Sequence, residues 1–265
     1  MKTFTDQLGN SLQLSALPQR IISLVPSQTE LLFDLGLDEE VVGLTKFCVH
    51  PKEKWRSKPR VGGTKKVDFA KIAALQPDLL IGNKEENDRT QIEELRKHYP
   101  VWMSDVVTVE DALDMIKSLG EITGKSHRST QLVAQISTAF QSATANPPSP
   151  IRVAYLIWYR PWMAVGSDTF IDSMLAQAGF TNVFHQKTRY PEITLEELAA
   201  AAPEVVMLSS EPFPFKQRHI AEIEQLCPLA VVKQVDGELF SWYGSRMLQA
   251  APYFASLRNE IIARL

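Results

Sequence analysis

The sequence predicts an α/β protein made of two related lobes, each built around a mainly parallel sheet. The first observation is a segment that occurs twice, because Ile72 to Ile81 matches Leu198 to Met207 position for position. Each copy reads as an Ala-rich helix end, a proline, an acidic residue and a short apolar run of buried-strand type. The second is that strand-like runs alternate with helical patterns, as in parallel sheets. The third is a proline-rich break at Asn146 to Pro150, which divides the chain.

The N-terminal lobe is expected to span residues 1–107. It opens with a strand at Arg20 to Val25 that ends at Pro26. The sequence Ser27 to Glu30 then reads as a capping box, and Gly36 ends the helix that it begins. The later elements predicted for this lobe are a strand at Val41 to Thr45, a helix from about Asp68, and strands at Leu79 to Ile81 and Val101 to Met103.

Residues 108–149 are expected to form a helical segment without a strand. Val109, Ala112, Leu113 and Ile116 recur at helical spacing, and a second stretch places Leu132, Val133, Ile136 and Phe140 on one face.

The C-terminal lobe is expected to span residues 150–265. Its first strand is Arg152 to Trp158, and Gly179 ends the following helix, Asp168 to Ala178, as Gly36 ends its counterpart. The remaining elements are a capping box at Thr194 to Glu197 that opens the second repeat copy, a strand at Val231 to Val235, and a terminal helix at Ser245 to Ala263, interrupted near Pro252.

Composition excludes several function classes. The net charge of −3 and the absence of any block of like charges give no footprint for nucleic acid. No apolar stretch approaches the roughly 18 residues of a membrane span. Asp6, Gln7 and Asn10 stand where a signal peptide has its apolar core, so the chain as given is expected in the cytoplasm, or in the periplasm if an export signal has been removed. Cys48 and Cys227 fall one in each lobe, and two free thiols suit a reducing compartment better than a disulfide.

Aromatic residues concentrate in the segments that follow the predicted strands. Loops of this kind line the ligand cleft of an α/β protein, and several rings there favour a flat, partly apolar ligand. Arg246 or Arg160 could receive a carboxylate or phosphate. The alternative is that the rings close lobe against lobe or cover strand ends. The rings in question include Trp158, Tyr159, Trp242 and Tyr243.

No motif predicts a protein-only metal site or a catalytic centre. Side chains of metal-ligand type are present, but no pair has the tight spacing of a zinc site, and nucleophile-elbow, phosphate-loop and dinucleotide motifs are absent. His50 could instead supply one ligand to a metal already held in an organic chelate. The side chains considered are Cys48, His50, Glu85, Glu86, His185, Glu192 and Glu211.

The order and spacing of these elements resemble the helical-backbone metal receptor family. The resemblance rests on Arg20 to Glu30, on Gln76 to Ile81, on the long helix between the lobes and on Arg152-Val153. This class III group of periplasmic binding proteins includes vitamin B12-binding and iron-siderophore-binding proteins that serve ABC importers. It implies two Rossmann-like lobes joined by one long rigid helix within Ser126 to Ala145. It also implies a metal chelate in the cleft and little hinge motion.

The resemblance to the B12-binding member also assigns individual positions. Phe47 and His50 stand where that protein has tyrosines near the ligand, Tyr190 stands at a cleft tryptophan, and Arg246 matches an arginine before the last helix. Thr64 and Asn83 replace tryptophans, which argues against cobalamin itself. Family members dock to their transporter through one glutamate on each lobe, and here Glu196 matches the second while Ala70 occupies the first.

The resulting prediction is a non-enzymatic, monomeric substrate-binding protein for a cobalt corrinoid, a ferric siderophore or a haem-like complex. An ABC permease is its possible partner. The metal arrives with the chelate, so no cofactor is expected to be bound by protein alone. The alternative is a cytoplasmic metal- or small-molecule-dependent enzyme, or a sensor, on the same two-lobed scaffold, using His50, Cys48 and the Glu85-Glu86 loop. The predicted ligand-binding residues are Phe47, His50, Thr64, Asn83, Trp158, Tyr159, Tyr190, Trp242, Tyr243 and Arg246.

Overall fold

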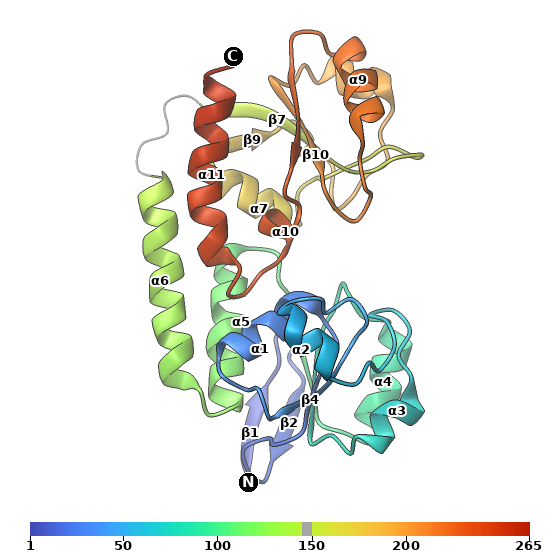
Figure 1. The fold of residues 1–265 in the computed structure, drawn as a ribbon, viewed down its shortest axis with the longest axis vertical. Coiled ribbons are helices and arrows are strands. Elements are labelled where there is room, and N and C mark those ends of the chain that lie inside the picture. The colour runs from blue at the N-terminus through green and yellow to red at the C-terminus, as the bar shows by residue number, and fades with distance from the viewer. Residues whose placement is uncertain (145–149) are drawn as a thin grey trace. The chain divides into compact units, whose positions relative to one another are not determined.

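The computed structural model describes residues 1–144 and 150–265 and divides into two compact units (Figure 1). Of the predicted break at Asn146 to Pro150, residues 146–149 lie outside the described residues. The first lobe consists of Met1–Val106, Glu110–Gln135 and Tyr243–Arg246. The second lobe consists of Val107–Val109, Ile136–Trp242 and Met247–Leu265.

The first lobe is built on a parallel four-stranded sheet with the order β4-β3-β5-β6. Alternate strand residues such as Ile22 and Leu80 point to one face, where Ile72 and Ile92 of two helices pack on them. The strands are β3 (Ile21–Ser23), β4 (Val41–Leu44), β5 (Leu79–Asn83) and β6 (Val101–Ser104), and the helices that follow them are α1 (Pro26–Asp34), α2 (Lys52–Ser57), α3 (Phe69–Ala74) and α4 (Arg89–Arg96).

The second lobe repeats this topology. Its parallel strands have the order β9-β7-β10-β11, and the short β8 adds an antiparallel edge to β7. The strands are β7 (Ile151–Trp158), β8 (Met163–Ala164), β9 (Phe180–Asn182), β10 (Val205–Ser209) and β11 (Val231–Val235). The helices are α7 (Phe170–Gln177), α8 (Leu195–Ala200), α9 (Gln217–Leu226), α10 (Glu238–Ser241) and α11 (Met247–Ile262).

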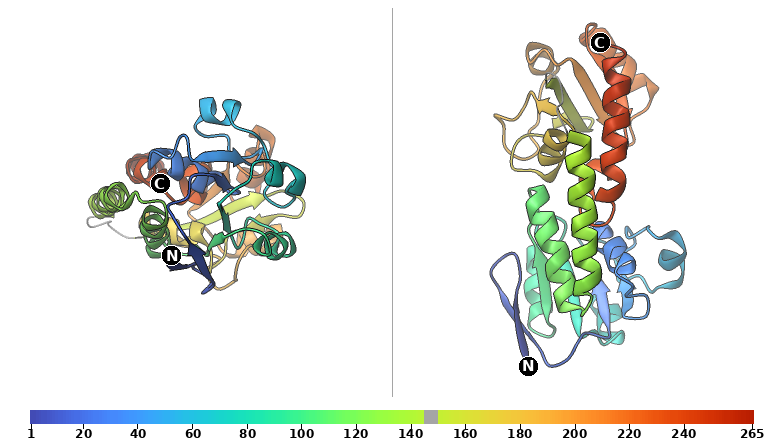
Figure 2. Two further views of the ribbon diagram at one scale, coloured as in Figure 1. Left: turned by 90° about the horizontal axis from the view of Figure 1, so that it is seen from below. Right: turned by 90° about the vertical axis from the view of Figure 1, so that its left-hand side faces the viewer.

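Two further helices connect the lobes in the chain. They are α5 (Val109–Ile122) and α6 (Ser126–Thr144), in the segment predicted to be helical, and Figure 2 shows α6 as one unbroken helix. The first part of α6 belongs to the first lobe and the part from Ile136 belongs to the second. The predicted fold class is confirmed: the protein is α/β, with two lobes of mainly parallel sheet joined by one long helix.

The two copies of the sequence repeat make the same hydrogen bonds between side chains and the backbone. The guanidinium of Arg20 donates to the carbonyl of Leu75, and that of Arg152 donates in the same way to Ala201. The acidic residue of each copy accepts a hydrogen bond from the backbone N–H of the same arginine, as Asp78 does from Arg20. The two halves therefore share the same structure at the amino ends of their strands.

Two sequence predictions about helices are wrong. Ser27 to Glu30 form no capping box, because α1 begins at Pro26 with Val25 as its N-cap. The fixed φ of proline suits the first helical position and starts the helix before the predicted cap. The terminal helix is not interrupted at Pro252, since α11 continues through it as an unbroken helix (Figure 2). Pro252 lies in the second turn, where one missing hydrogen bond is tolerated by a helix that is packed along its length.

The chain before Arg20, for which the sequence indicated no element, forms a hairpin of β1 (Lys2–Thr5) and β2 (Ser11–Leu14). Asp6 at its turn is fully buried and accepts a hydrogen bond of 2.7 Å from the guanidinium of Arg96 on α4. The N–H of Gln7 donates to the carbonyl of Met103. The hairpin is thus fixed to the first lobe by polar contacts.

Candidate functional site

Each lobe has candidate binding loops that follow its parallel strands, at the carboxyl ends where ligands bind in open α/β sheets. In the first lobe these loops follow β4 and β5. In the second lobe they follow β7, β10 and β11. Each lobe is described separately below.

The loops after β7 and β10 of the second lobe form an aromatic cluster, defined as Trp158, Tyr159, Trp162, Phe213, Phe215 and His219. Tyr159 lies at its centre, with its ring centroid 4.8 Å from Trp162, 5.7 Å from Phe213 and 4.6 Å from His219. Trp162 and Phe215 are buried, but Trp158 is 39 % exposed and makes an edge contact with the ring of Phe213. Trp158 therefore presents part of its ring to solvent beside a set of packed rings.

His219 is a polar member of this cluster that the sequence did not identify. Its Nδ1 accepts a hydrogen bond of 2.8 Å from the N–H of Lys216, just before α9. Burial, with the nearby charge of Arg218 as a smaller cause, lowers the pKa of His219. The ring is therefore neutral at physiological pH, as its role as an acceptor requires.

Two hydrogen bonds join Glu211, after β10, to residues that follow β11. Oε1 of Glu211 accepts from Nε1 of Trp242 at 3.0 Å and from Oγ of Ser241 at 2.8 Å. Burial raises the pKa of the Glu211 carboxyl, although these two hydrogen bonds oppose the shift. The predicted ligand residue Trp242 is buried, and Glu211 determines the orientation of its indole.

The segment that follows Trp242 returns to the first lobe. Arg246 forms a bidentate ion pair with Glu30 of α1, at 2.8 Å from Nε and 2.7 Å from Nη2. Burial also raises the pKa of Tyr243 well above its ordinary value. The ion pair with Glu30 uses the Nε–Nη2 edge of the guanidinium, the group that was predicted to receive a ligand carboxylate or phosphate. Glu30, which the sequence explained by helix capping, is instead the partner of Arg246.

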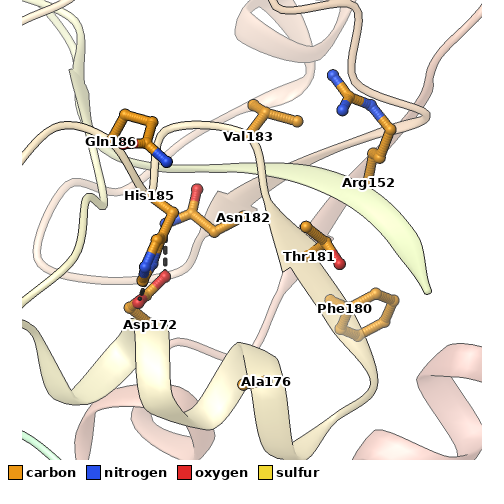
Figure 3. A pocket seen from close by; sticks show the side chains of 9 residues that line it. All are labelled: Arg152, Asp172, Ala176, Phe180, Thr181, Asn182, Val183, His185 and Gln186. Atoms are coloured by element: carbon orange, nitrogen blue, oxygen red, sulfur yellow. Dashed lines mark hydrogen bonds and ion pairs between the residues drawn. The ribbon is translucent and has the colours of Figure 1, made fainter.

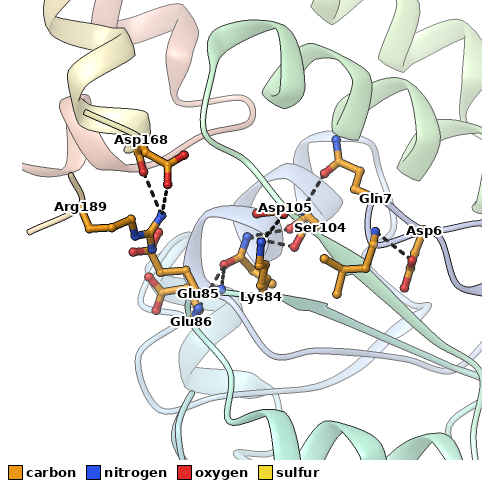
Figure 4. Close-up of polar contacts among 11 residues, drawn as sticks. Asp6, Gln7, Lys84, Glu85, Glu86, Ser104, Asp105, Asp168 and Arg189 are labelled. Atoms are coloured by element: carbon orange, nitrogen blue, oxygen red, sulfur yellow. Dashed lines mark hydrogen bonds and ion pairs between the residues drawn. The ribbon is translucent and has the colours of Figure 1, made fainter. Parts of the chain in front are cut away.

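The loop after β5 is closed by its own side chains (Figure 4). Oδ1 of Asn83 accepts hydrogen bonds from the N–H groups of Glu85 and Glu86, at 2.8 and 3.1 Å. Its amide donates to Oγ of Ser104 at 3.0 Å, and only 3 % of Asn83 is exposed. Asn83 therefore shapes the loop from within. Lys84 turns outward and pairs with Asp105 at 2.6 Å.

The loop after β4 faces an open pocket of about 830 Å³ within the first lobe. The pocket contains two predicted ligand residues, Phe47 and Thr64, and the Phe47 side chain is 50 % exposed. Its lining residues are Lys46, Phe47, Gly62, Gly63, Thr64, Lys65, Lys66, Val67, Asp68 and Phe69.

His50 and Cys48 lie in the same loop. His50 is partly exposed. Cys48 is buried as a free thiol beside Thr45, and burial raises its pKa. Cys227 is the other free, buried cysteine. Among residues 1–144 and 150–265, no group of three or more potential ligand side chains could hold a metal ion.

Tyr190 of the second lobe is partly exposed, and the guanidinium of Arg189 lies 5.7 Å from its ring centroid. Nη1 of Arg189 donates to the carbonyl of Asp168 at 2.9 Å (Figure 4). Gly166 allows the close approach of this segment, because a Cβ there would meet the carbonyl oxygen of Lys187 at 2.0 Å.

A separate pocket of about 410 Å³ lies beside β9 in the second lobe (Figure 3). His185 Nδ1 is 2.9 Å from Asp172, whose other oxygen accepts from Asn182 at 2.7 Å. His185, which was considered as a possible metal ligand, is therefore paired with Asp172. This pair lies beside β9, whereas the aromatic cluster follows β7 and β10.

The two positions assigned to transporter docking are structurally equivalent. Glu196 lies in the first turn of α8 and Ala70 in the first turn of α3, and both are exposed. Hydrogen bonds from its own backbone N–H and from Thr194 lower the pKa of Glu196.

The chain matches a family model described as periplasmic binding protein over residues 21–226. It is 22 % identical over 255 residues to the vitamin B12-binding protein of Pectobacterium atrosepticum, covering 93 % of this chain and 90 % of that one.

Two solved structures show the same fold. The periplasmic vitamin B12-binding protein of Vibrio cholerae has a TM-score of 0.78 at 19 % identity, covering 92 % of this chain and 98 % of that one. The periplasmic heme-binding protein of the same organism has a TM-score of 0.79 at 22 % identity, covering 91 % and 98 %. No helix within the described part of the chain is long and apolar enough to cross a membrane.

Proposed function

Because the chain belongs to the periplasmic binding protein family, we propose that it is the substrate-binding protein of an ABC importer and captures a metal-bearing organic chelate. The chemical classes are a corrinoid, a haem-like tetrapyrrole and a ferric siderophore. The vitamin B12- and heme-binding relatives support the first two. Proteins of this type bind their substrates without transforming them, and we propose the same non-enzymatic role here.

The observation that carries this proposal is the exposed ring of Trp158 on the aromatic cluster. An exposed tryptophan supported by buried rings gives a flat, apolar surface at the strand ends, and burial of such a ring stabilises a bound flat ligand. Phe47 gives a second exposed ring, on the first lobe. His50 lies three residues further on and could complete the coordination of the metal. Tyr159, Tyr190, Trp242 and Tyr243 complete the proposed aromatic surfaces, with Thr64 in the pocket of the first lobe, while Asn83 and Arg246 position the loops.

We also propose that Glu196 contacts the permease and that the contact is one-sided, since Ala70 offers no charge at the equivalent position. The solved B12- and heme-binding relatives are periplasmic, and we propose the same compartment and a monomeric state. Glu196→Ala should lower uptake of the ligand by cells while leaving binding in solution unchanged. Equal uptake by both proteins would contradict a docking role for Glu196.

The test of the proposed function is spectroscopic. Protein isolated from its own cells is examined for colour and metal content, and purified protein is titrated with cyanocobalamin, haemin and a set of ferric siderophores. We expect a shift in the visible spectrum of at least one chelate, together with quenching of tryptophan fluorescence. A complete panel that gives neither a spectral change nor heat in calorimetry would overturn the proposal.

A further inference from the structure

The pocket of the first lobe is basic. Lys46, Lys65 and Lys66 line it, and Asp68 is the acidic residue among its lining side chains. Oδ1 of Asp68 accepts a hydrogen bond of 3.1 Å from the N–H of Lys71 as the cap of α3, and its other oxygen lies 3.4 Å from Nζ of Lys71. The carboxylate of Asp68 is therefore already engaged outside the set of three lysines.

The backbone that carries two of these lysines is a tight turn. The N–H of Gly63 donates to the carbonyl of Lys66 at 2.8 Å, and the N–H of Lys46 donates to the carbonyl of Gly62 at 2.8 Å. Gly62 has a φ of +110°, and a Cβ there would lie 2.6 Å from the carbonyl oxygen of Lys66. Only glycine is compatible with both this φ and this approach, so the turn and the β4 loop are held together.

Two side chains from the neighbouring loop and helix hold the turn. The side chain of Gln91 on α4 donates to the carbonyl of Lys65 at 2.7 Å and accepts from the N–H of Val67 at 2.8 Å. The amide of Asn87 donates to the carbonyl of Thr64 at 3.0 Å. These contacts fix the positions from which the lysine side chains extend, which lowers the ordering cost of binding.

The ammonium groups of Lys46, Lys65 and Lys66 differ in their contacts within the protein. Lys65 donates to the backbone carbonyl of Glu85, and the ammonium of Lys46 lies 4.9 Å from the ring centroid of Phe47. In the part of the chain that the structure describes, none of the three forms an ion pair with a carboxylate. By contrast, Lys187 in the corresponding segment of the second lobe pairs with Glu197 at 2.8 Å. The first lobe thus retains uncompensated positive charge within a preformed pocket.

We infer that the ligand presents anionic oxygen atoms to this pocket, where Lys46 and Lys66 bind them while its apolar body covers the exposed ring of Phe47. Lys65 mainly holds the turn through Glu85. This inference rests on the proposed function and narrows it to chelates with an anionic periphery. The anionic oxygens can be carboxylates on the rim of a tetrapyrrole or corrin, or the deprotonated chelating oxygens of a ferric siderophore. Ammonium groups bind both as charge-assisted hydrogen-bond donors.

The experiment compares, within each class of ligand, an anionic member with a neutral or cationic one. One arm pairs cobyrinic acid, whose corrin rim carries carboxylates, with cyanocobalamin, whose rim carries amides. A second arm pairs a tetrasulfonated porphyrin with a tetracationic methylpyridyl porphyrin. The third arm pairs an anionic ferric tricatecholate with the cationic ferrioxamine B. Binding is measured by fluorescence quenching and calorimetry at low and high salt, for the wild type and for the double variant Lys46→Ala/Lys66→Ala.

We expect the anionic member of at least one pair to bind more tightly, with an affinity that falls as salt is added. The double variant should bind that ligand about tenfold more weakly, as expected for the loss of two charge-assisted contacts. Its affinity for a neutral member that binds should not change, and its affinity for a cationic member should not fall. Both lysines are exposed, so the thermal melting curve should be unaltered. Lys117→Ala removes an exposed lysine of α5 and is the matched control.

The inference is overturned if the neutral or cationic members bind as tightly as the anionic ones, or if the double variant and the wild type have equal affinities for the anionic ligand. Either result leaves the proposed function standing. Failure of every member of all three pairs to bind would overturn the inference, and the proposed function falls as well if the titration panel, haemin included, also shows no binding. The pair whose anionic member binds more tightly to the wild type than to the double variant identifies the class of ligand that supplies the anionic oxygens.

Discussion

Glu211 holds Trp242 through a hydrogen bond of 3.0 Å between Oε1 and the indole Nε1. The carboxyl and the indole come from different strand-end loops of the second lobe, after β10 and after β11. Because the acceptor is a carboxyl group in a buried position, the contact links the orientation of a predicted ligand residue to the protonation of a glutamate.

Glu211→Gln should change how the stability of the protein depends on pH. Burial raises the pKa of Glu211 above its ordinary value of 4.5, so its contribution to the unfolding free energy is fully present below pH 4.5. That contribution is lost as pH rises through the folded-state pKa. Glutamine keeps an acceptor oxygen for Trp242 and does not titrate. We therefore expect the wild type to lose stability relative to the variant between about pH 4.5 and neutral pH, in urea unfolding.

The exposed Glu224→Gln is the matched control, and its difference from the wild type should be constant over the same range. A constant difference for Glu211→Gln as well would contradict the role of burial.

His219→Asn should reveal the opposite pH dependence. The pKa of His219 is lowered from 6.5, so its contribution to stability is present above pH 6.5 and is lost as pH falls through the folded-state pKa. Asparagine can still accept from the N–H of Lys216 but cannot become charged. The melting temperature of the wild type should fall more steeply than that of the variant between about pH 7 and about pH 5. Parallel melting-temperature curves for the wild type and His219→Asn would contradict the lowered pKa of His219. His127→Asn, at an exposed site, should melt in parallel with the wild type.

Arg246→Ala should destabilise the first lobe strongly, because it leaves the buried carboxylate of Glu30 without its guanidinium partner. Loss of one member of a buried pair typically costs about 3–5 kcal/mol. The double variant Glu30→Leu/Arg246→Met should recover much of this loss, since it leaves no buried charge. Urea unfolding measures all three proteins. The exposed pair Lys2–Glu121, also 2.8 Å apart, is the control, and Lys2→Ala should cost less than about 1 kcal/mol. Similar costs at the two pairs would show that burial of the Arg246 pair is unimportant.

Trp158→Ala should weaken binding and leave the fold intact. Trp158 is 39 % exposed and lies at the edge of the cluster, so its removal should disturb the packing less than removal of a fully buried ring. We expect roughly a tenfold or greater loss of affinity for the chelate identified by titration, because ring burial contributes on the order of 1–3 kcal/mol. Leu229→Ala, at a residue that is 96 % exposed, should bind normally. If Trp158→Ala binds the chelate with wild-type affinity, the aromatic cluster is not part of the binding site.

Tyr159→Ala tests whether a ring contributes by packing within the cluster, as distinct from touching the ligand. Its ring packs on Trp162, Phe213 and His219, so truncation should lower the melting temperature as well as the affinity. Calorimetric unfolding of Tyr159→Ala beside Trp158→Ala checks this difference. An unchanged melting temperature would show that the cluster does not depend on its central ring.

The fold was predictable because its signals are local. Gly36 and Gly179, with φ values of +80° and +75°, end matching helices, and Thr194 with Glu197 forms the predicted capping box. Both signals act within one turn of chain, so the sequence reveals them. The short strands β8 and β9 and the N-terminal hairpin were missed, because two to four residues are too few to show a period.

The candidate site was only partly predictable. Aromatic residues after strands were visible in the sequence, and the structure brings Trp158, Tyr159 and Phe213 together. The partners of polar residues were not visible, because Glu30 meets Arg246 from the far end of the chain. The three lysines of the basic pocket were missed for the same reason, since Lys46 reaches Lys65 and Lys66 only through the turn at Gly62.

The duplicated turn before each proline has a consequence for protein engineering. Gln76 and Ala202 adopt the same left-handed backbone, with φ of +46° and +43°, before Pro77 and Pro203, although their side chains differ. These turns lie at the amino ends of β5 and β10, whereas the loops proposed to contact the ligand leave from the carboxyl ends. Binding loops could therefore be exchanged between homologues, or between the halves of this chain, with the joining turns kept as an unchanged frame.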